Sequence, residues 1–184
     1  MKKQIYEWIF ENVMGWKIEG SFDEQIKKCV FMVMPHTSWH DFYVAIICRG
    51  ALGVAINWVG KKELFRFPFG YFFKSLGGVP LDRTGGLNKV ESIAGIFNSK
   101  EIFRLGLSPE GTRKKVEQLK TGFYYIALKA SVPIIPVSIN FEKKAVDFGI
   151  PFNPTGNIES DLIILKKHFI NAKGKIQEKG YEVD

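Results

Sequence analysis

Short runs of mostly apolar residues recur along the chain, and glycine, proline or polar residues separate them. A run of five or six residues that is apolar throughout is typical of a strand buried on both faces of a parallel sheet. From these runs and the turn residues between them, we predict strands at residues 17–20, 29–34, 54–59, 78–81, 103–107 and 132–141. Residues 144–148 are expected to pair with the last of these as a hairpin.

Between the predicted strands, apolar residues recur every three or four positions, which indicates helices. We place helices at residues 42–51, 88–98, 121–130 and 159–172, and we expect a frayed tail through Asp184. Near the N-terminus, Ile5, Trp8 and Val13 share one face of a helix and two glutamates lie on the other. This amphipathic segment, residues 1–16, either packs on the core or lies at a membrane interface, and the two interpretations are compatible.

The alternation of strands and helices over 184 residues predicts the α/β class, with a central mixed sheet flanked by helices in a single domain, residues 1–184. The longest apolar stretch, residues 42–60, contains Arg49, Asn57 and three glycines, so we expect no membrane-spanning helix. Glu7 and Glu11 interrupt what would be the apolar core of a signal peptide, so we do not expect secretion.

A net charge of +7 favours an anionic partner, whether nucleic acid, a membrane surface or a phosphorylated substrate. The basic residues are scattered and form no aromatic-basic recognition motif, which argues against nucleic acid. Cys29 and Cys48 both lie in apolar stretches, as expected for buried thiols in a reducing compartment rather than for a disulfide. We therefore expect a cytoplasmic protein.

A candidate base and a residue to orient it follow the strand at residues 29–34. His36 comes just after that strand, and Asp41 opens the next helix, where a carboxylate suits the helix dipole. Residues five apart on a regular helix lie on different faces, so the carboxylate reaches the imidazole only if the intervening residues turn outside the helix. In that geometry Asp41 fixes the tautomer of His36 and stabilises the imidazolium of a general base.

The same segment is compatible with two other chemistries. His36 and His40 are four residues apart, as in some zinc sites, but the only other histidine is His168, so we expect no metal. Ser38 completes the residue types of a serine hydrolase, but the Gly-x-Ser-x-Gly elbow of those enzymes is absent.

Groups that bind anions follow two other strands. The block Pro109-Glu-Gly-Thr-Arg113 combines a rigid turn, a glycine that exposes backbone N–H groups, a hydroxyl and a guanidinium, which together suit a phosphate. The block Gly77-Gly-Val-Pro-Leu-Asp-Arg83 brings a second arginine, and two guanidiniums at strand ends can converge on one phosphate. Lys120 continues the loop after the first block, where it either adds charge or is solvated. Each block alone is also compatible with an ordinary polar turn.

In their order along the chain these blocks resemble four motifs of the glycerolipid acyltransferase family, whose best-known members are the 1-acylglycerol-3-phosphate acyltransferases. The motifs are His36-x4-Asp41, Gly77-Gly-x-Pro-x-Asp-Arg83, Pro109-Glu-Gly-Thr-Arg113 and Val132-Pro-Ile-Ile-Pro136. The resemblance runs from about Val30 to Ile139 and implies the fold of that family and an O-acyltransferase of phospholipid biosynthesis. Ser108 departs from the pattern, which has an apolar residue there, and this bears on the acceptor pocket.

The resemblance also implies roles for individual residues. His36 takes the proton of an acceptor hydroxyl, which attacks an acyl thioester directly, and Asp41 orients His36. Substrate binding is assigned to Arg83, Glu110, Gly111, Thr112 and Arg113, with Lys120 beside them. The implied donor is a thioester of coenzyme A or of acyl carrier protein, with no further cofactor. The implied acceptor is a lyso-glycerophospholipid such as 1-acylglycerol-3-phosphate, and another alcohol or an amine is the alternative.

Residues 64–73 hold five phenylalanines and one tyrosine. We predict that at least half of these rings pack in the core, and that the others line an acyl groove or contact a membrane. Lys61, Lys62, Arg66 and Lys74 lie beside them, so we expect peripheral association with an anionic membrane surface. A non-catalytic lipid-binding module is the main alternative, although the retained base, carboxylates and arginines argue against it.

Overall fold

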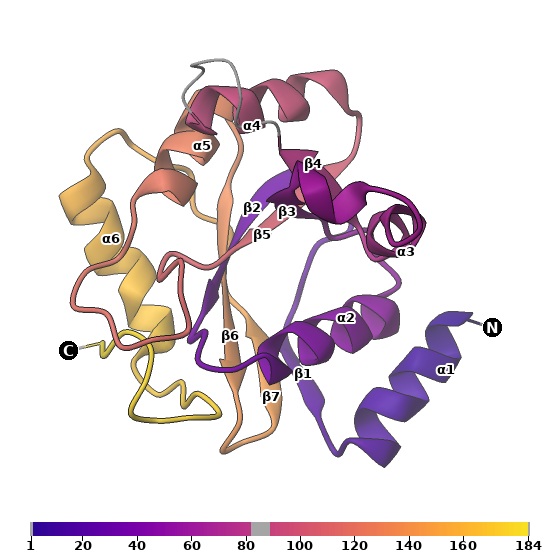
Figure 1. The fold of residues 1–184 in the computed structure, drawn as a ribbon. Helices are drawn as coiled ribbons and strands as arrows, with labels where there is room; N and C mark the ends of the chain where they lie inside the picture. Colours follow the sequence, from indigo (N-terminus) through magenta and orange to yellow (C-terminus); the bar gives the residue numbers. More distant parts are fainter. Residues whose placement is uncertain (1, 82–88, 184) are drawn as a thin grey trace.

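The chain, described by a computed structural model over residues 2–81 and 89–183, is built on a five-stranded sheet of order β1-β7-β6-β2-β5 (Figure 1). Its strands are β1 (Lys17–Gly20), β2 (Lys28–Met34), β5 (Phe103–Leu107), β6 (Ile134–Asn140) and β7 (Ala145–Phe148). β2 pairs in parallel with β5 and β6, whereas β7 runs antiparallel to β6 and parallel to β1. The predicted mixed sheet is confirmed.

A second, two-stranded sheet extends the first beyond β5. It consists of β3 (Trp58–Lys61) and β4 (Gly78–Leu81) in parallel, with η2 (Lys62–Phe65) and α3 (Gly70–Ser75) between them. Asn57 forms a bridge to Leu105 of β5, and its N–H donates to the Arg104 carbonyl. The strand predicted at residues 54–59 therefore begins later than expected, because pairing starts only where the chain reaches the edge of β5.

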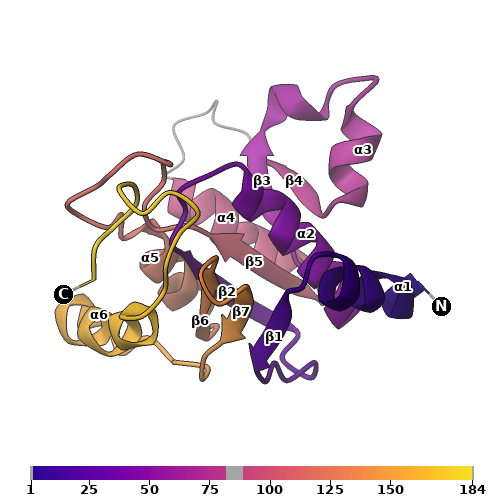
Figure 2. The ribbon, with the colours of Figure 1, turned by 90° about the horizontal axis from the view of Figure 1, so that it is seen from below.

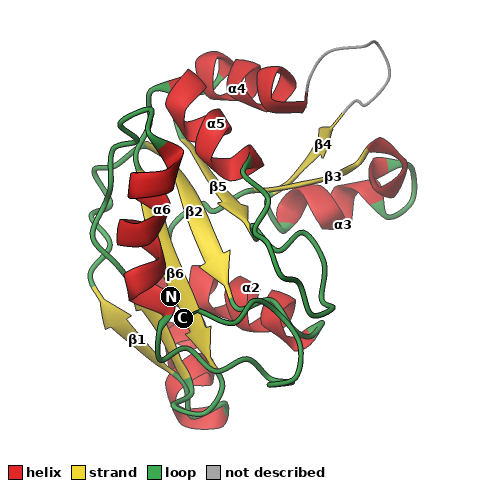
Figure 3. Cartoon of the chain, turned by 90° about the vertical axis from the view of Figure 1, so that its left-hand side faces the viewer, coloured by secondary structure: helices red, strands yellow, loops and turns green. Residues whose placement is uncertain are grey.

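Helices cover both faces of the central sheet (Figure 3). One face carries α4 (Lys89–Ser99), α5 (Gly122–Ala130) and α6 (Ile158–Lys166), and the other carries α1 (Lys2–Trp8), the π-helix η1 (Ile9–Val13) and α2 (His40–Leu52). Alternate residues of β2 divide between the two layers, with Val30 and Met32 on the α4–α6 side and Cys29 and Phe31 on the α2 side. This arrangement is why β2 reads as continuously apolar.

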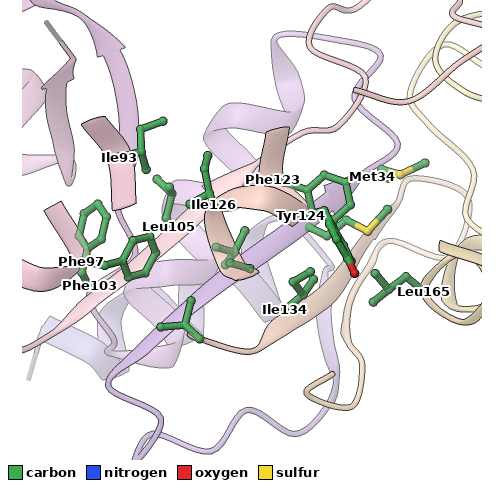
Figure 4. Packing of buried hydrophobic residues seen from close by; sticks show 14 of the residues in the cluster. Met34, Ile93, Phe97, Phe103, Leu105, Phe123, Tyr124, Ile126, Ile134 and Leu165 are labelled. Atoms are coloured by element: carbon green, nitrogen blue, oxygen red, sulfur yellow. The ribbon is translucent and has the colours of Figure 1, made fainter. Parts of the chain in front are cut away.

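The larger core cluster lies under α4, α5 and α6 (Figure 4). The rings of Phe97 and Phe103 meet edge to face there, with centroids 4.7 Å apart. The buried hydroxyl of Tyr124 donates to Asp161 of α6 at 2.7 Å. In the other layer, Cys29 and Cys48 are free, buried thiols as predicted, and burial raises the pKa of each to about 12.

The N-terminal segment is helical from Lys2 to Val13, shorter than the expected residues 1–16, and Ile5, Trp8 and Val13 on its apolar face are exposed. α1 packs on α2 through Tyr6, whose ring lies so close to Gly50 that a Cβ there would be 2.4 Å from it. Phe10 is buried, whereas the side chains of Trp8 and Val13 are 59% and 62% exposed. The helix therefore anchors by one face and leaves large apolar side chains on another.

The aromatic segment at residues 64–73 is mostly at the surface, so the prediction that at least half of its rings lie in the core is wrong. Phe65 and Phe73 pack around Trp58, with ring centroids 5.8 and 6.0 Å from it. The other rings are exposed: Phe67, Phe69, Tyr71 and Phe72. Figure 2 shows the reason, because β3, β4 and α3 stand apart from the main layers and offer little interior. We call residues 58–81 the aromatic lobe.

The carboxyl-terminal residues are ordered, so the predicted fraying is wrong as far as Tyr181. After α6 and the 3-10 helix η3 (Lys167–Phe169), the chain returns across the molecule. Tyr181 forms a bridge to Val116, and Gly180 is buried. The polar composition of this segment gives no sign that the main-chain N–H groups of Ile176 and Tyr181 donate to the buried side chains of Thr37 and Glu110. Within the described ranges, no helix combines the length and apolarity that a membrane crossing needs.

Candidate active site

The site lies at the carboxyl ends of two neighbouring parallel strands. His36 follows β2 and the block that contains Glu110 follows β5, and these strands pair in register from Lys28 with Phe103 to Met32 with Leu107. Parallel strands end at the same edge of a sheet, which is where open α/β folds bind ligands. The two motifs therefore meet although 74 residues separate His36 from Glu110.

The ring of His36 bonds to the carboxylate of Asp41, with Nδ1 and Oδ2 2.9 Å apart. The same oxygen accepts the main-chain N–H groups of Thr37 at 2.8 Å and Ser38 at 2.9 Å. Helix α2 begins only at His40, so the residues before it turn outside the helix, as the five-residue spacing requires. The side chain of Asp41 is 3% exposed and that of His36 is 31% exposed.

This pairing leaves one imidazole nitrogen free. When Nδ1–H donates to the carboxylate, Nε2 carries a lone pair, and Nε2 has no partner in the part of the chain that the structure describes. Asp41 Oδ1 is also buried and lacks a hydrogen bond from the described residues. Asp41 therefore holds the ring and the backbone N–H groups through Oδ2 alone.

Glu110 holds the backbone of His36. Its Oε2 accepts the main-chain N–H of His36 and, at 3.1 Å, the hydroxyl of Ser108. Its Oε1 accepts the main-chain N–H of Tyr181 at 2.9 Å. Burial raises the pKa of Glu110, although these hydrogen bonds oppose that effect. Glu110 is 0% exposed, so its carboxylate lies below the surface of the protein.

The other residues of the third motif form an exposed turn. Gly111 adopts a positive φ of 63°, and a Cβ there would lie 2.6 Å from Nζ of Lys120. The structure thus brings Lys120 against the turn. Arg113 is exposed beside it, and the Thr112 hydroxyl accepts the main-chain N–H of Lys114 at 3.4 Å. Arg83, predicted to bind substrate, lies outside the described residues.

The ring of His40 has partners other than His36 and Asp41. Its Nδ1 lies 2.7 Å from the Ser38 hydroxyl, and its ring stacks on Trp39 with centroids 4.2 Å apart. Ser38 is thus bonded to His40 rather than to His36. Over residues 2–81 and 89–183, no group of three histidine, cysteine, aspartate or glutamate side chains is arranged to hold a metal ion.

An apolar cavity of about 270 Å³ opens beside His36 and Asp41. It is lined by the sheet on one side, by α2 from Asp41 to Arg49 on another, and by Trp58. At 1.5 Å per residue, the helix follows the cavity for about 12 Å. Residues 64–73, which were expected to line an acyl groove, do not line this cavity. Its aromatic wall comes from Trp58, the residue around which the aromatic lobe packs.

Comparison with known proteins agrees with this geometry. The sequence profile of the family described as Acyltransferase matches residues 17–140. The chain is 31% identical over 143 residues to the chloroplastic 1-acyl-sn-glycerol-3-phosphate acyltransferase BAT2 of Brassica napus, covering 73% of this chain and 38% of that protein. It is 36% identical over 88 residues to the 1-acyl-sn-glycerol-3-phosphate acyltransferase of Escherichia coli, covering 45% of this chain and 36% of that protein. The chain thus spans less than half the length of either relative.

A solved structure shares the fold. The 1-acyl-sn-glycerophosphate acyltransferase PlsC from Thermotoga maritima superposes with a TM-score of 0.58 at 18% identity, covering 90% of this chain and 77% of that one. The matched profile includes both strands that carry the site and both of their motifs, His36 to Asp41 and Ser108 to Arg113. The chain belongs to the acyltransferase family.

Proposed function

We propose that this protein transfers a fatty acyl group from a thioester to a hydroxyl of a lyso-glycerophospholipid such as 1-acylglycerol-3-phosphate. The observation that carries the proposal is the 2.9 Å contact between His36 Nδ1 and Asp41 Oδ2, beside an apolar cavity. The relatives from Brassica napus and Escherichia coli, both called 1-acyl-sn-glycerol-3-phosphate acyltransferases, support the choice of acceptor.

In the proposed reaction, Nε2 of His36 takes the proton of the acceptor hydroxyl as its oxygen attacks the thioester carbonyl. A carbon–oxygen bond forms, the carbon–sulfur bond breaks, and the imidazolium returns the proton to the leaving thiolate. Asp41 stabilises the imidazolium in between, because its charge lies against Nδ1. The products are the diacyl lipid and the free thiol of the carrier, either coenzyme A or acyl carrier protein.

The cavity along α2 is the proposed site of the acyl chain. Its walls are almost entirely apolar, from Phe31 and Val137 of the sheet to Cys48 of the helix, so a hydrocarbon chain loses water on entering it. Binding energy from the chain would hold the thioester carbonyl next to His36 and Asp41, which line the same cavity.

The acceptor phosphate is proposed to bind at the turn after β5. Gly111, Thr112, Arg113 and Lys120 supply backbone N–H groups, a hydroxyl and two positive charges on one exposed loop. Arg83 is proposed as a further phosphate ligand. Glu110, which bonds to the backbone of His36, is proposed to position the base rather than to contact the acceptor.

We also propose that the protein associates peripherally with an anionic membrane, from the cytoplasmic side. Large apolar side chains are exposed on α1 and on the aromatic lobe, including Trp8 at 59% and Phe69 at 65%. The exposed cations Arg66 and Lys74 lie within the lobe, among its exposed rings in the sequence. Phe42 and Trp58 contact each other, with ring centroids 5.7 Å apart, and both line the cavity. This continuity would let an acyl chain pass from lipid to site without crossing water.

Two alternatives make different predictions. A lipid-binding module would use the apolar cavity without turnover, whereas an enzyme for another alcohol or an amine would turn over with a different acceptor. The test is thiol release from acyl coenzyme A and from acylated carrier protein, with lyso-lipids, alcohols and amines as acceptors. Release that requires 1-acylglycerol-3-phosphate supports the proposal. Release with another acceptor alone corrects the substrate, and no release with either donor contradicts the enzymatic role.

A further inference from the structure

The segment from Gly174 to Tyr181 contacts the active-site loops, although it lies outside residues 17–140, which the family profile matches. The main-chain N–H of Ile176 donates to the hydroxyl of Thr37 at 3.2 Å. The main-chain N–H of Tyr181 donates to Glu110 Oε1 at 2.9 Å. In Figures 1 and 2 this yellow segment runs beside the loop that follows β5.

Two glycines allow this close approach. A Cβ at Gly180 would lie 2.8 Å from Glu110 Oε1 and 3.0 Å from Thr37 Cγ2. A Cβ at Gly174 would lie 2.6 Å from Thr37 Cγ2. Side chains at these positions would therefore push directly on the two residues that the segment binds.

Thr37 and Glu110 are the residues that hold the candidate base. Glu110 Oε2 accepts the main-chain N–H of His36, and the main-chain N–H of Thr37 donates to Asp41 Oδ2. Thr37 is 1% exposed and Glu110 0% with the segment in place, so their acceptor atoms are bonded to the N–H groups of the segment and not to bulk water. A shift in either residue would therefore move His36 relative to Asp41 and change the geometry of the contact between His36 Nδ1 and Asp41 Oδ2.

We propose that the segment Gly174–Tyr181 is a positioning part of the active site. The main-chain N–H groups of Ile176 and Tyr181 hold Thr37 and Glu110 in place. These two residues in turn keep the His36 ring within hydrogen-bond distance of Asp41. The catalytic consequence rests on the proposed function, but the positioning itself does not. A segment that only stabilised the fold would change the unfolding temperature and leave kcat of the folded protein unchanged.

The chain offers a matched pair of variants to separate these roles. Gly180 and Gly156 both have a positive φ, 85° and 99°, so alanine imposes a similar backbone strain at each. The methyl group meets Glu110 and Thr37 at position 180 and nothing within 4 Å at position 156. We expect Gly180→Ala to lower kcat by about tenfold or more, with KM for the acyl donor unchanged, because small misplacements of reacting groups are costly. Gly156→Ala is expected to keep kcat.

A readout independent of turnover is the ¹H–¹⁵N NMR signal of the His36 main-chain amide, which bonds to Glu110. We expect this signal to move in Gly180→Ala and to stay in place in Gly156→Ala. An unmoved signal together with equal kcat values in the two variants would overturn the positioning role. If the wild-type protein shows no acyl transfer, the proposed function fails while the NMR comparison still decides the positioning.

A second pair of variants applies if Gly180→Ala does not fold. Thr37→Val removes the hydroxyl that accepts the N–H of Ile176 and keeps the shape of the side chain, whereas Thr37→Ser keeps the hydroxyl. We expect kcat to fall by about tenfold in Thr37→Val and to be largely retained in Thr37→Ser. Full activity in Thr37→Val, with the His36 amide signal unmoved, would contradict the proposal.

Discussion

Two buried carboxylates hold His36 from opposite ends. Asp41 bonds to the ring through Nδ1, and Glu110 bonds to the backbone through the main-chain N–H. The spacing of His36 and Asp41 makes the first contact predictable from the sequence, because a turn of that length can fold back on itself. The second contact joins residues 74 apart and uses a main-chain donor, which carries no signature in the residue types.

Replacing Asp41 with asparagine tests the first contact. Asp41→Asn removes the charge that stabilises the imidazolium, so we expect kcat to fall by about a hundredfold or more. Asp147→Asn is the control, since Asp147 lies 3.6 Å from His168 in a second His–Asp contact on β7. The measurement is steady-state acyl transfer by both variants. Equal activities in the two would contradict the role of Asp41.

The buried Glu110 predicts a dependence of stability on pH. Burial raises its pKa above the ordinary value of 4.5, so the folded protein binds this proton more tightly than the unfolded chain does. The stability linked to the proton is complete below pH 4.5 and is lost as the pH rises through the raised pKa. Relative to Glu110→Gln, we expect the wild-type free energy of unfolding in urea titrations to fall as the pH rises above 4.5. A difference that grows with pH would contradict this assignment.

At the scale of elements, α2 performs two tasks along its length. Its first turn supplies Asp41, and the face that continues to Arg49 lines the apolar cavity. The helix was predictable from its apolar periodicity. The cavity was not, because its other walls come from β2, β6 and Trp58, and strand order must be known before those walls can be assembled. The aromatic lobe was misjudged because composition does not reveal how little interior a two-stranded sheet provides.

Narrowing the cavity should change the choice of acyl chain. Cys48 is buried on α2 and lines the cavity, so Cys48→Leu adds volume where the chain is proposed to lie. Each methylene group that no longer fits loses about 0.8 kcal/mol of burial. We expect the ratio of kcat/KM for long over short acyl donors to fall by roughly tenfold. Ile47→Leu, on the same helix but away from the cavity, is the control, and an equal ratio in both variants would refute the acyl site.

Removing exposed rings from α1 and the aromatic lobe should weaken membrane binding. Trp8→Ser and Phe69→Ser are each expected to lower partition onto anionic vesicles by about tenfold, and added salt should weaken it further. Ile163→Ser is matched in exposure, at 63%, and lies on α6, on the opposite side of the molecule from α1 and α3 (Figure 1). Vesicle sedimentation measures all three variants. Equal binding by all of them would exclude these surfaces as the membrane contact.

At the scale of the whole molecule, the two motif loops, the cavity and the carboxyl-terminal segment converge at one edge of the central sheet. The sequence was sufficient to predict the layered α/β class and the two buried thiols. The class follows from the alternation of strands and helices, and the burial of Cys29 and Cys48 follows from the apolar stretches around them. It was insufficient to predict that the chain returns to Glu110. Gly180 acts there by allowing a close approach and Tyr181 by donating its main-chain N–H, and residue types reveal neither. Local composition there is that of a frayed tail.

The most direct test of the central claim is acceptor-dependent thiol release by wild type, His36→Ala and His40→Ala. His40 offers a control four residues away, because its ring bonds to Ser38 rather than to Asp41. Base catalysis by His36 predicts that His36→Ala loses the acceptor-dependent release while His40→Ala keeps most of it. Release that survives in His36→Ala, or that is lost equally in both variants, would contradict the assignment of His36 as the base.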